Sequence, residues 1–168
     1  MPTISIKTLL PREIQLAWDM RGSRQLALGD LNAASRESGL SNERIMELIQ
    51  LRLVVAFNIA TNPDGERPEY RVLIRSLIFL IESNYVRQMD RENWDPIFRL
   101  IFPYKLAGKP KALAGTEVAS GLNCTRQHVS ALSATGCFSI INEAKQGRGN
   151  TGSFTTASVE AWLKSRML

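Results

Sequence analysis

The fold is decided by the stretch Ala119-Ser120-Gly121-Leu122-Asn123-Cys124-Thr125-Arg126-Gln127-His128-Val129, which repeats in residue type the stretch Ser35-Arg36-Glu37-Ser38-Gly39-Leu40-Ser41-Asn42-Glu43-Arg44-Ile45 at an offset of 84. A small residue, a bend residue, a capping hydroxyl and an apolar residue recur in the same order. After a hairpin of different length the offset becomes 82, so that residues 113–163 repeat residues 29–81. Few residues are identical, but the pattern of residue types predicts a tandem array of one small module.

Each position in this pattern has a local structural role. Gly39 and Asn123 stand where a tight turn needs left-handed backbone, which glycine adopts freely and asparagine more readily than most residues. Ser41 and Thr125 follow two places later, and their hydroxyls can accept a hydrogen bond from the first turn of the helix that they open. Apolar residues three and four apart then give that helix one buried face and one polar face. Each module is predicted to run helix, turn, helix, hairpin, helix, which makes the fold class mainly α with small β-hairpin wings.

The composition predicts a folded protein without a membrane segment. The chain has 168 residues, of which 44% are apolar, and this is enough for a hydrophobic core. Met1-Pro2-Thr3 opens no signal peptide. The longest apolar stretches, residues 51–59 and 72–81, contain arginine and are shorter than the roughly 20 residues that a membrane helix needs. We therefore expect a cytoplasmic protein with no membrane partner.

Residue patterns typical of catalysis or metal binding are sparse. The chain has one histidine, and its two cysteines, Cys124 and Cys137, have no neighbouring metal-ligand spacing. Neither a zinc site nor a disulfide framework is therefore indicated, and reduced thiols are expected. The spacing supports no Ser-His-Asp, Cys-His or paired-carboxylate arrangement. The sequence predicts a protein that is not an enzyme and that needs no catalytic residue, metal or cofactor.

Positive charge is concentrated toward the C-terminus. Residues 106–168 carry seven lysine and arginine residues against three acidic ones, whereas residues 1–105 carry 14 against 13. A helix is expected from Asp95-Pro96 to Pro103, and the basic, Gly/Pro-rich stretch 105–111 that follows is typical of a linker. We therefore place a domain boundary between residues 105 and 106. The pI of about 9.6 indicates nucleic-acid binding, with a solvated basic face as the alternative.

Residues 113–166 resemble the winged helix-turn-helix of excisionases and MerR-type regulators, and residues 31–83 resemble it more weakly. The resemblance is carried by Glu117-Val118-Ala119, by Asn123-Cys124-Thr125, by the expected helix 126–135 and hairpin 136–154, and by Ser158-Val159-Glu160-Ala161-Trp162-Leu163. It implies two tandem winged helix-turn-helix modules joined by a helical connector and a basic linker. It also implies that a helix enters the major groove of DNA while a wing follows the adjacent backbone or minor groove.

The start of the helix at 126–135 is the expected base-reading part. Arg126 could bind guanine and Gln127 adenine, although both could instead hold phosphate or belong to an ordinary exposed polar face. The glycine-rich stretch 145–152 indicates a basic wing, with a solvated hairpin tip as the alternative. The candidate DNA-binding residues are Thr125, Arg126, Gln127, His128, Ser130, Lys145, Arg148, Asn150, Lys109 and Lys111, with Arg44 and Arg71 as auxiliary contacts.

The N-terminal module differs in chemistry. Its second helix carries Glu43 and Glu47, which repel phosphate unless they accept from cytosine, and its hairpin is acidic. The stretches 51–57 and 77–81 are more apolar than one small module needs, which predicts a homodimer interface or a protein partner, with a larger monomer core as the alternative. Residues 1–105 are interpreted as a degenerate module with flanking helices for dimerisation or interaction, and residues 106–168 as the DNA-binding module.

Together these features predict a sequence-specific double-stranded DNA-binding protein of bacterial, phage or plasmid type. It would act as a transcription regulator or as an accessory factor in recombination or partition. A homodimer would read an inverted repeat with half-sites about one helical turn apart. The alternative is a protein-interaction adaptor whose duplicated modules bind no DNA.

Overall fold

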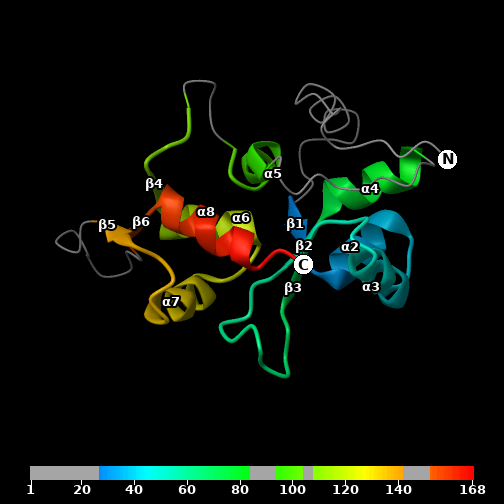
Figure 1. The fold of residues 1–168 in the computed structure, drawn as a ribbon, viewed down its shortest axis with the longest axis horizontal. Helices are drawn as coiled ribbons and strands as arrows, with labels where there is room; N and C mark the ends of the chain where they lie inside the picture. Colours follow the sequence, from blue (N-terminus) through cyan, green and yellow to red (C-terminus); the bar gives the residue numbers. More distant parts are fainter. Residues whose placement is uncertain (1–26, 84–93, 104–107, 142–151) are drawn as a thin grey trace.

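The computed structural model describes residues 27–83, 94–103, 108–141 and 152–168 of the chain. The described residues form helices and two small three-stranded antiparallel sheets, in agreement with the predicted mainly α class (Figure 1). We call residues 27–83 the N-terminal unit and residues 108–168 the C-terminal unit. Helix α5 (Trp94–Ile101) lies between them in the sequence. The candidate wing residues Lys145, Arg148 and Asn150 lie outside the described residues.

The two units have the same order of elements. The N-terminal unit consists of β1 (Leu28–Gly29), α2 (Leu31–Ser38), α3 (Asn42–Gln50), β2 (Ala56–Asn58), β3 (Tyr70–Leu73) and α4 (Ile74–Ser83). The C-terminal unit consists of β4 (Ala112–Ala114), α6 (Gly115–Leu122), α7 (Arg126–Ala134), β5 (Ile140–Ile141), β6 (Ser153–Thr155) and α8 (Thr156–Ser165). The helix, turn, helix, hairpin, helix order expected from the sequence is therefore present in both. The short strands β1 and β4, which open each unit, were not expected.

The repeat extends to strand register and single hydrogen bonds. The sheets have the equivalent orders β1-β3-β2 and β4-β6-β5. Leu28 pairs with Leu73 in the first sheet and Ala112 with Thr155 in the second. Ala112 follows Leu28 by the offset of 84, and Thr155 follows Leu73 by the offset of 82. At the same offsets, the Ser76 hydroxyl accepts from the Val55 N–H at 3.1 Å, and the Ser158 hydroxyl accepts from the Ser139 N–H at 3.0 Å. The two units thus share one backbone plan although few of their residues are identical.

The turn between the two helices of each unit has the predicted chemistry. Gly39 has a φ of 76° and Asn123 a φ of 51°, so both adopt the left-handed backbone. The Ser41 hydroxyl caps α3 by accepting from the Arg44 N–H at 3.2 Å. In the same way, the Thr125 hydroxyl caps α7 by accepting from the His128 N–H at 3.1 Å. The predicted bend and cap residues are therefore confirmed at all four positions.

The sheet of the N-terminal unit is buried on both faces. Side chains alternate between the two faces of a strand, and Ala56 and Val72 pack with α2, α3 and α4 in a small core. Val55, Phe57 and Leu73 point to the other face and join a larger core with α5 and the C-terminal unit. In Figure 1 this sheet accordingly lies in the middle of the molecule, between α2–α3 and the C-terminal unit. The hydrophobic core therefore continues across the boundary predicted at residues 105 and 106.

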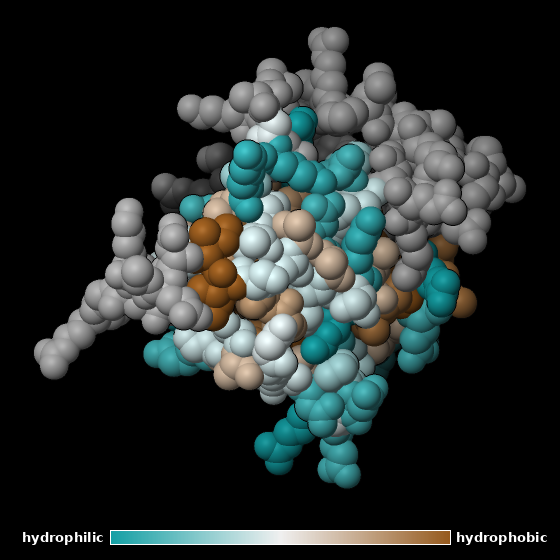
Figure 2. Space-filling model, turned by 60° about the vertical axis from the view of Figure 1, so that its left-hand side comes forward, coloured by the Kyte–Doolittle hydropathy of each residue, from teal (hydrophilic) through white to brown (hydrophobic). Residues whose placement is uncertain are grey.

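This arrangement corrects the interpretation of the surplus apolar residues. Residues 54–60 are all buried, because a strand covered on both faces needs apolar residues at successive positions. Leu77 and Ile78 are buried in the small core as well. Of the large apolar side chains in the described residues, only Leu51, Ile81 and Ile140 are exposed, and apolar colour is confined to small separate areas on the face drawn in Figure 2. The larger monomer core, the alternative to a dimer interface, accounts for the buried part of these stretches, whereas Leu51 and Ile81 remain exposed.

The end of the chain also joins the two units. After α8, the chain lies along the outer edge of β2, where the Asn58 N–H donates to the Arg166 carbonyl at 3.1 Å. The Leu168 N–H donates to the Ala56 carbonyl at 2.9 Å, and Phe57 and Met167 form an antiparallel bridge. Residues 166–168 thus extend the N-terminal sheet (Figure 1). None of the helices within the described ranges is long and apolar enough to cross a membrane.

Candidate nucleic-acid interface

Helix α7 presents a polar face beside the helix-helix turn of the C-terminal unit. Val129 and Leu132 on its inner side are fully buried in the larger core. Arg126, Gln127 and Ser130 on its outer side are exposed, and their side chains make no hydrogen bond or ion pair to the described residues. Three of the predicted base-reading or phosphate-holding residues are therefore brought together and available to a ligand. Thr125 is exposed too, but its hydroxyl caps the helix.

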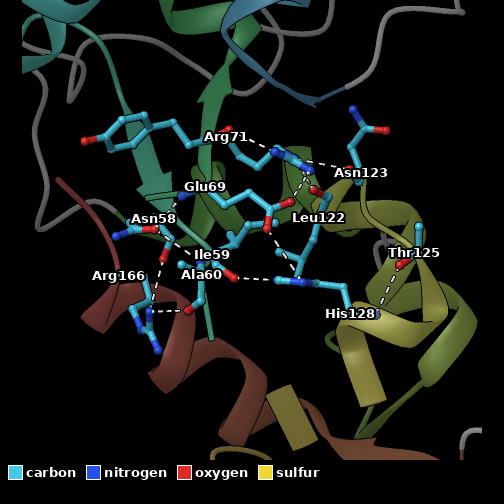
Figure 3. Close-up of polar contacts among 11 residues, drawn as sticks. Asn58, Ile59, Ala60, Glu69, Arg71, Leu122, Asn123, Thr125, His128 and Arg166 are labelled. Atoms are coloured by element: carbon cyan, nitrogen blue, oxygen red, sulfur yellow. Dashed lines mark hydrogen bonds and ion pairs between the residues drawn. The ribbon is translucent and has the colours of Figure 1, made fainter. Parts of the chain in front are cut away.

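His128 points from the same helix toward the N-terminal unit. Its side chain is 18% exposed, and Nε2 lies 2.6 Å from the Ile59 carbonyl oxygen (Figure 3). Because a carbonyl only accepts, Nε2 carries the proton in this bond. Nδ1 lies 3.6 Å from a carboxylate oxygen of Glu69. These contacts give His128 a role between the units, in place of the phosphate contact considered from the sequence.

Arg71 is buried between the units and corrects the expectation of an auxiliary DNA contact. It is 8% exposed, and its Nε donates to the carbonyls of Leu122 and Asn123, both at 3.1 Å. Its remaining guanidinium nitrogens donate to the Tyr70 carbonyl and to Glu69, each at 3.0 Å. The carbonyls at a helix C-terminus lack partners within the helix and carry partial negative charge, which a guanidinium stabilises. Arg71 thus caps the end of α6 from the other unit (Figure 3).

Lys109 also has a structural position. Its Nζ lies 2.7 Å from Asp95 on α5 and 2.8 Å from Glu160 on α8, and 5.2 Å from the centre of the Phe98 ring. The hydrogen bond from Lys109 holds the pKa of Asp95 below its usual value. Burial lowers the pKa of Lys109, but the bonds to the two carboxylates outweigh it and leave that pKa raised. Lys109 therefore connects α5 to α8 rather than facing a ligand.

Two further predicted cations, Lys111 and Arg44, are exposed. Lys111 is exposed and makes no side-chain hydrogen bond or ion pair to the part of the chain that the structure describes. Arg44 is exposed on α3 and pairs with Glu47 at 2.6 Å. Sequence reasoning missed Arg166, which donates to the carbonyls of Asn58 and Ala60 at 3.3 and 2.8 Å. No local signal marks it, because its partners lie more than 100 residues away in the sequence.

No family model, curated protein or solved structure matches the chain. Across the four described ranges, no group of three or more His, Cys, Asp or Glu side chains is placed to hold a metal ion. The chemistry of the site therefore has to follow from its own residues. The described part of the candidate interface is the outer face of α7, together with the exposed Lys111 directly before β4.

Proposed function

We propose that the chain is a sequence-specific double-stranded DNA-binding protein that inserts α7 into the major groove. The observation that carries this proposal is the exposed face of Arg126, Gln127 and Ser130 at the start of the second helix of a helix-turn-helix, whose side chains have no bonding partner among the described residues. The first turns of such a helix are the part that meets base edges. The winged form of the module and its use in transcription, recombination or partition belong to the same proposal.

Charge supports α7 rather than its counterpart α3 as the reading helix. Residues 126–134 contain no acidic residue, whereas Glu43 and Glu47 are exposed on α3. Residues 106–168 carry a net charge of +4, which favours phosphate binding through release of counterions. A guanidinium such as that of Arg126 fits the two acceptors of guanine, and the amide of Gln127 fits adenine.

Selection of bound duplexes from a random double-stranded pool by the full chain tests the proposal. We expect a preferred sequence, and we expect Arg126→Ala to weaken its binding by roughly 1–3 kcal/mol and to relax the preference at one base pair. The matched control is Arg36→Ala, which removes the same charge from an exposed position on α2. Equal losses for the two variants would mean that net charge alone binds DNA.

A chain that recovers no preferred duplex and does not shift random duplex at low salt would contradict the proposal. That outcome favours the alternative function, an adaptor that binds protein only. Binding of random duplex without any preference would retain the nucleic-acid partner and contradict the base-reading roles of Arg126 and Gln127.

A further inference from the structure

We infer that the N-terminal unit acts in DNA recognition as a support that orients α7, with Glu69, Arg71 and His128 as its positioning residues. This inference rests on the proposed function of α7. It assigns to the N-terminal unit a role that needs no DNA contact of its own. It also removes Arg71 and His128 from the set of phosphate contacts.

The contacts from the N-terminal unit converge on the helix-turn-helix itself. Arg71 donates to the carbonyls of Leu122 and Asn123 at the end of α6. The Ile59 carbonyl accepts from His128 in the first turn of α7. Glu69 links the two contacts, because one of its oxygens lies 3.0 Å from Arg71 and the other 3.6 Å from His128 (Figure 3). Both ends of the turn that sets the direction of α7 are therefore fixed from the same hairpin, formed by β2 and β3.

The groups that make these contacts are themselves held firmly. Arg71 belongs to β3, the central strand of its sheet, which pairs with β1 and β2. The Asn58 side chain accepts from the N–H groups of Ala60 and Glu69 at 3.1 and 3.0 Å and thereby closes the base of the hairpin. The Ile59 N–H donates to the Glu69 carbonyl at 2.8 Å. The carbonyl that receives His128 thus comes from a closed and paired segment.

Position matters because His128 lies between the reading residues along α7. Arg126 and Gln127 precede it and Ser130 follows within the same turn, so a bond at His128 fixes the rotation of all three about the helix axis. Recognition groups need to be held to within about 0.5 Å of their productive position. Helices of eight or nine residues such as α6 and α7 gain little stability alone and depend on tertiary contacts.

The repeat provides an internal comparison. At the offset of 84, the counterpart of His128 is Arg44 on α3, which is 58% exposed and pairs only with Glu47 on its own helix among the described residues. Both units have the bend and the cap, but of these two helices only α7 has a side-chain hydrogen bond to the other unit within the described residues. The support is therefore specific to the helix that carries the proposed reading face.

The test uses the full chain with two neutral replacements of the histidine. The amide nitrogen of His128→Gln reaches close to the place of Nε2 and can still donate to Ile59, whereas that of His128→Asn is too short. We expect the asparagine variant to bind the selected duplex roughly tenfold more weakly and random duplex as before, with an unchanged slope of log affinity against log salt. The glutamine variant should bind like the wild type.

A fall of about one in the salt slope for both variants would identify His128 as a phosphate contact and overturn the inference. Equal weakening by glutamine and asparagine would overturn it as well. Amide hydrogen exchange of the free protein provides a readout without DNA: residues 126–130 should exchange faster in His128→Asn than in His128→Gln. Equal exchange in the two variants would contradict the inference, whether or not the protein binds DNA. A wild type that binds no duplex would contradict only the proposed function.

Discussion

Cys124 lies in the turn between α6 and α7, directly after the left-handed Asn123. Its side chain is partly buried against the larger core, and burial raises the pKa of its thiol from 9.0 to about 11. The thiolate is the reactive form of cysteine, so a higher pKa lowers reactivity at neutral pH. Burial also raises the pKa of Cys137, so both thiols are less ionised at neutral pH than a free cysteine.

We expect iodoacetamide to modify Cys124 in the folded protein about 100-fold more slowly than in the denatured chain, since two pKa units change the thiolate fraction by that factor at neutral pH. Mass spectrometry of a timed alkylation series measures both rates. Cys124→Ser identifies the slow site and separates it from Cys137. Modification of Cys124 at the denatured rate would mean that the turn opens frequently in solution.

Single residues were predictable where their role is local. The left-handed Gly39 and Asn123 and the capping Ser41 and Thr125 follow from backbone chemistry within a few residues, and all four are as predicted. Arg71 was assigned wrongly because its carbonyl partners lie 51 and 52 residues away. One signal was present: an arginine inside the apolar strand Tyr70–Leu73 requires a buried partner.

Helix α5 packs against α6 through a close approach at Gly121. A Cβ at this position would lie 2.2 Å from a carbon of the Phe102 ring, just after α5. Phe102 is 5% exposed, and its ring centre lies 5.2 Å from that of Phe98. The ring therefore has little room to move, and glycine is required here by space rather than by backbone conformation.

Gly121→Ala should lower the free energy of unfolding. Alanine favours a helix over glycine by up to about 1 kcal/mol, but overpacking of a core costs roughly 1–3 kcal/mol, so the clash should outweigh the gain. Urea denaturation followed by circular dichroism measures the difference. The control is Ser120→Ala on the same helix, which is exposed and should change stability by less than about 0.5 kcal/mol. A more stable Gly121→Ala would show that α5 and α6 lie further apart.

The longer elements were predictable because their periodic patterns extend over several turns. Helices α3 and α7 begin directly after their predicted caps. Helix α5 ends before Pro103 as expected but begins at Trp94, one residue before the predicted cap Asp95. Strands β1 and β4 have two and three residues, too few for alternation to be visible. The stretches 51–57 and 77–81 were recognised as unusually apolar, but sequence alone did not distinguish a second buried sheet face from a dimer interface.

The larger core crosses the domain boundary predicted between residues 105 and 106. The predicted linker marks a change in composition, whereas the larger core runs from β1 and β3 through α5 to α8. The homodimer remains a prediction, although residues 54–57, Leu77 and Ile78, which contributed to it, are buried within the chain. If two copies associate, the contact has to use other surfaces, and the exposed Leu51 at 65% is one candidate outside both cores.

The shared core predicts that residues 106–168 do not fold when excised. The excised fragment lacks five core residues, Trp94, Ile97, Phe98, Ile101 and Phe102, and the residues that pack against them become exposed. Each such burial contributes roughly 1.5–3 kcal/mol, so the loss is of order 10 kcal/mol, comparable to the total stability of about 5–15 kcal/mol of a domain. Circular dichroism of the excised fragment should show an unfolded chain, and a fragment of residues 94–168 should recover part of the helix signal. The full chain should unfold in one cooperative transition. Two separate transitions, one of them matching the 106–168 fragment, would mean that the C-terminal unit folds independently and that the contacts at Arg71 and His128 join two finished domains.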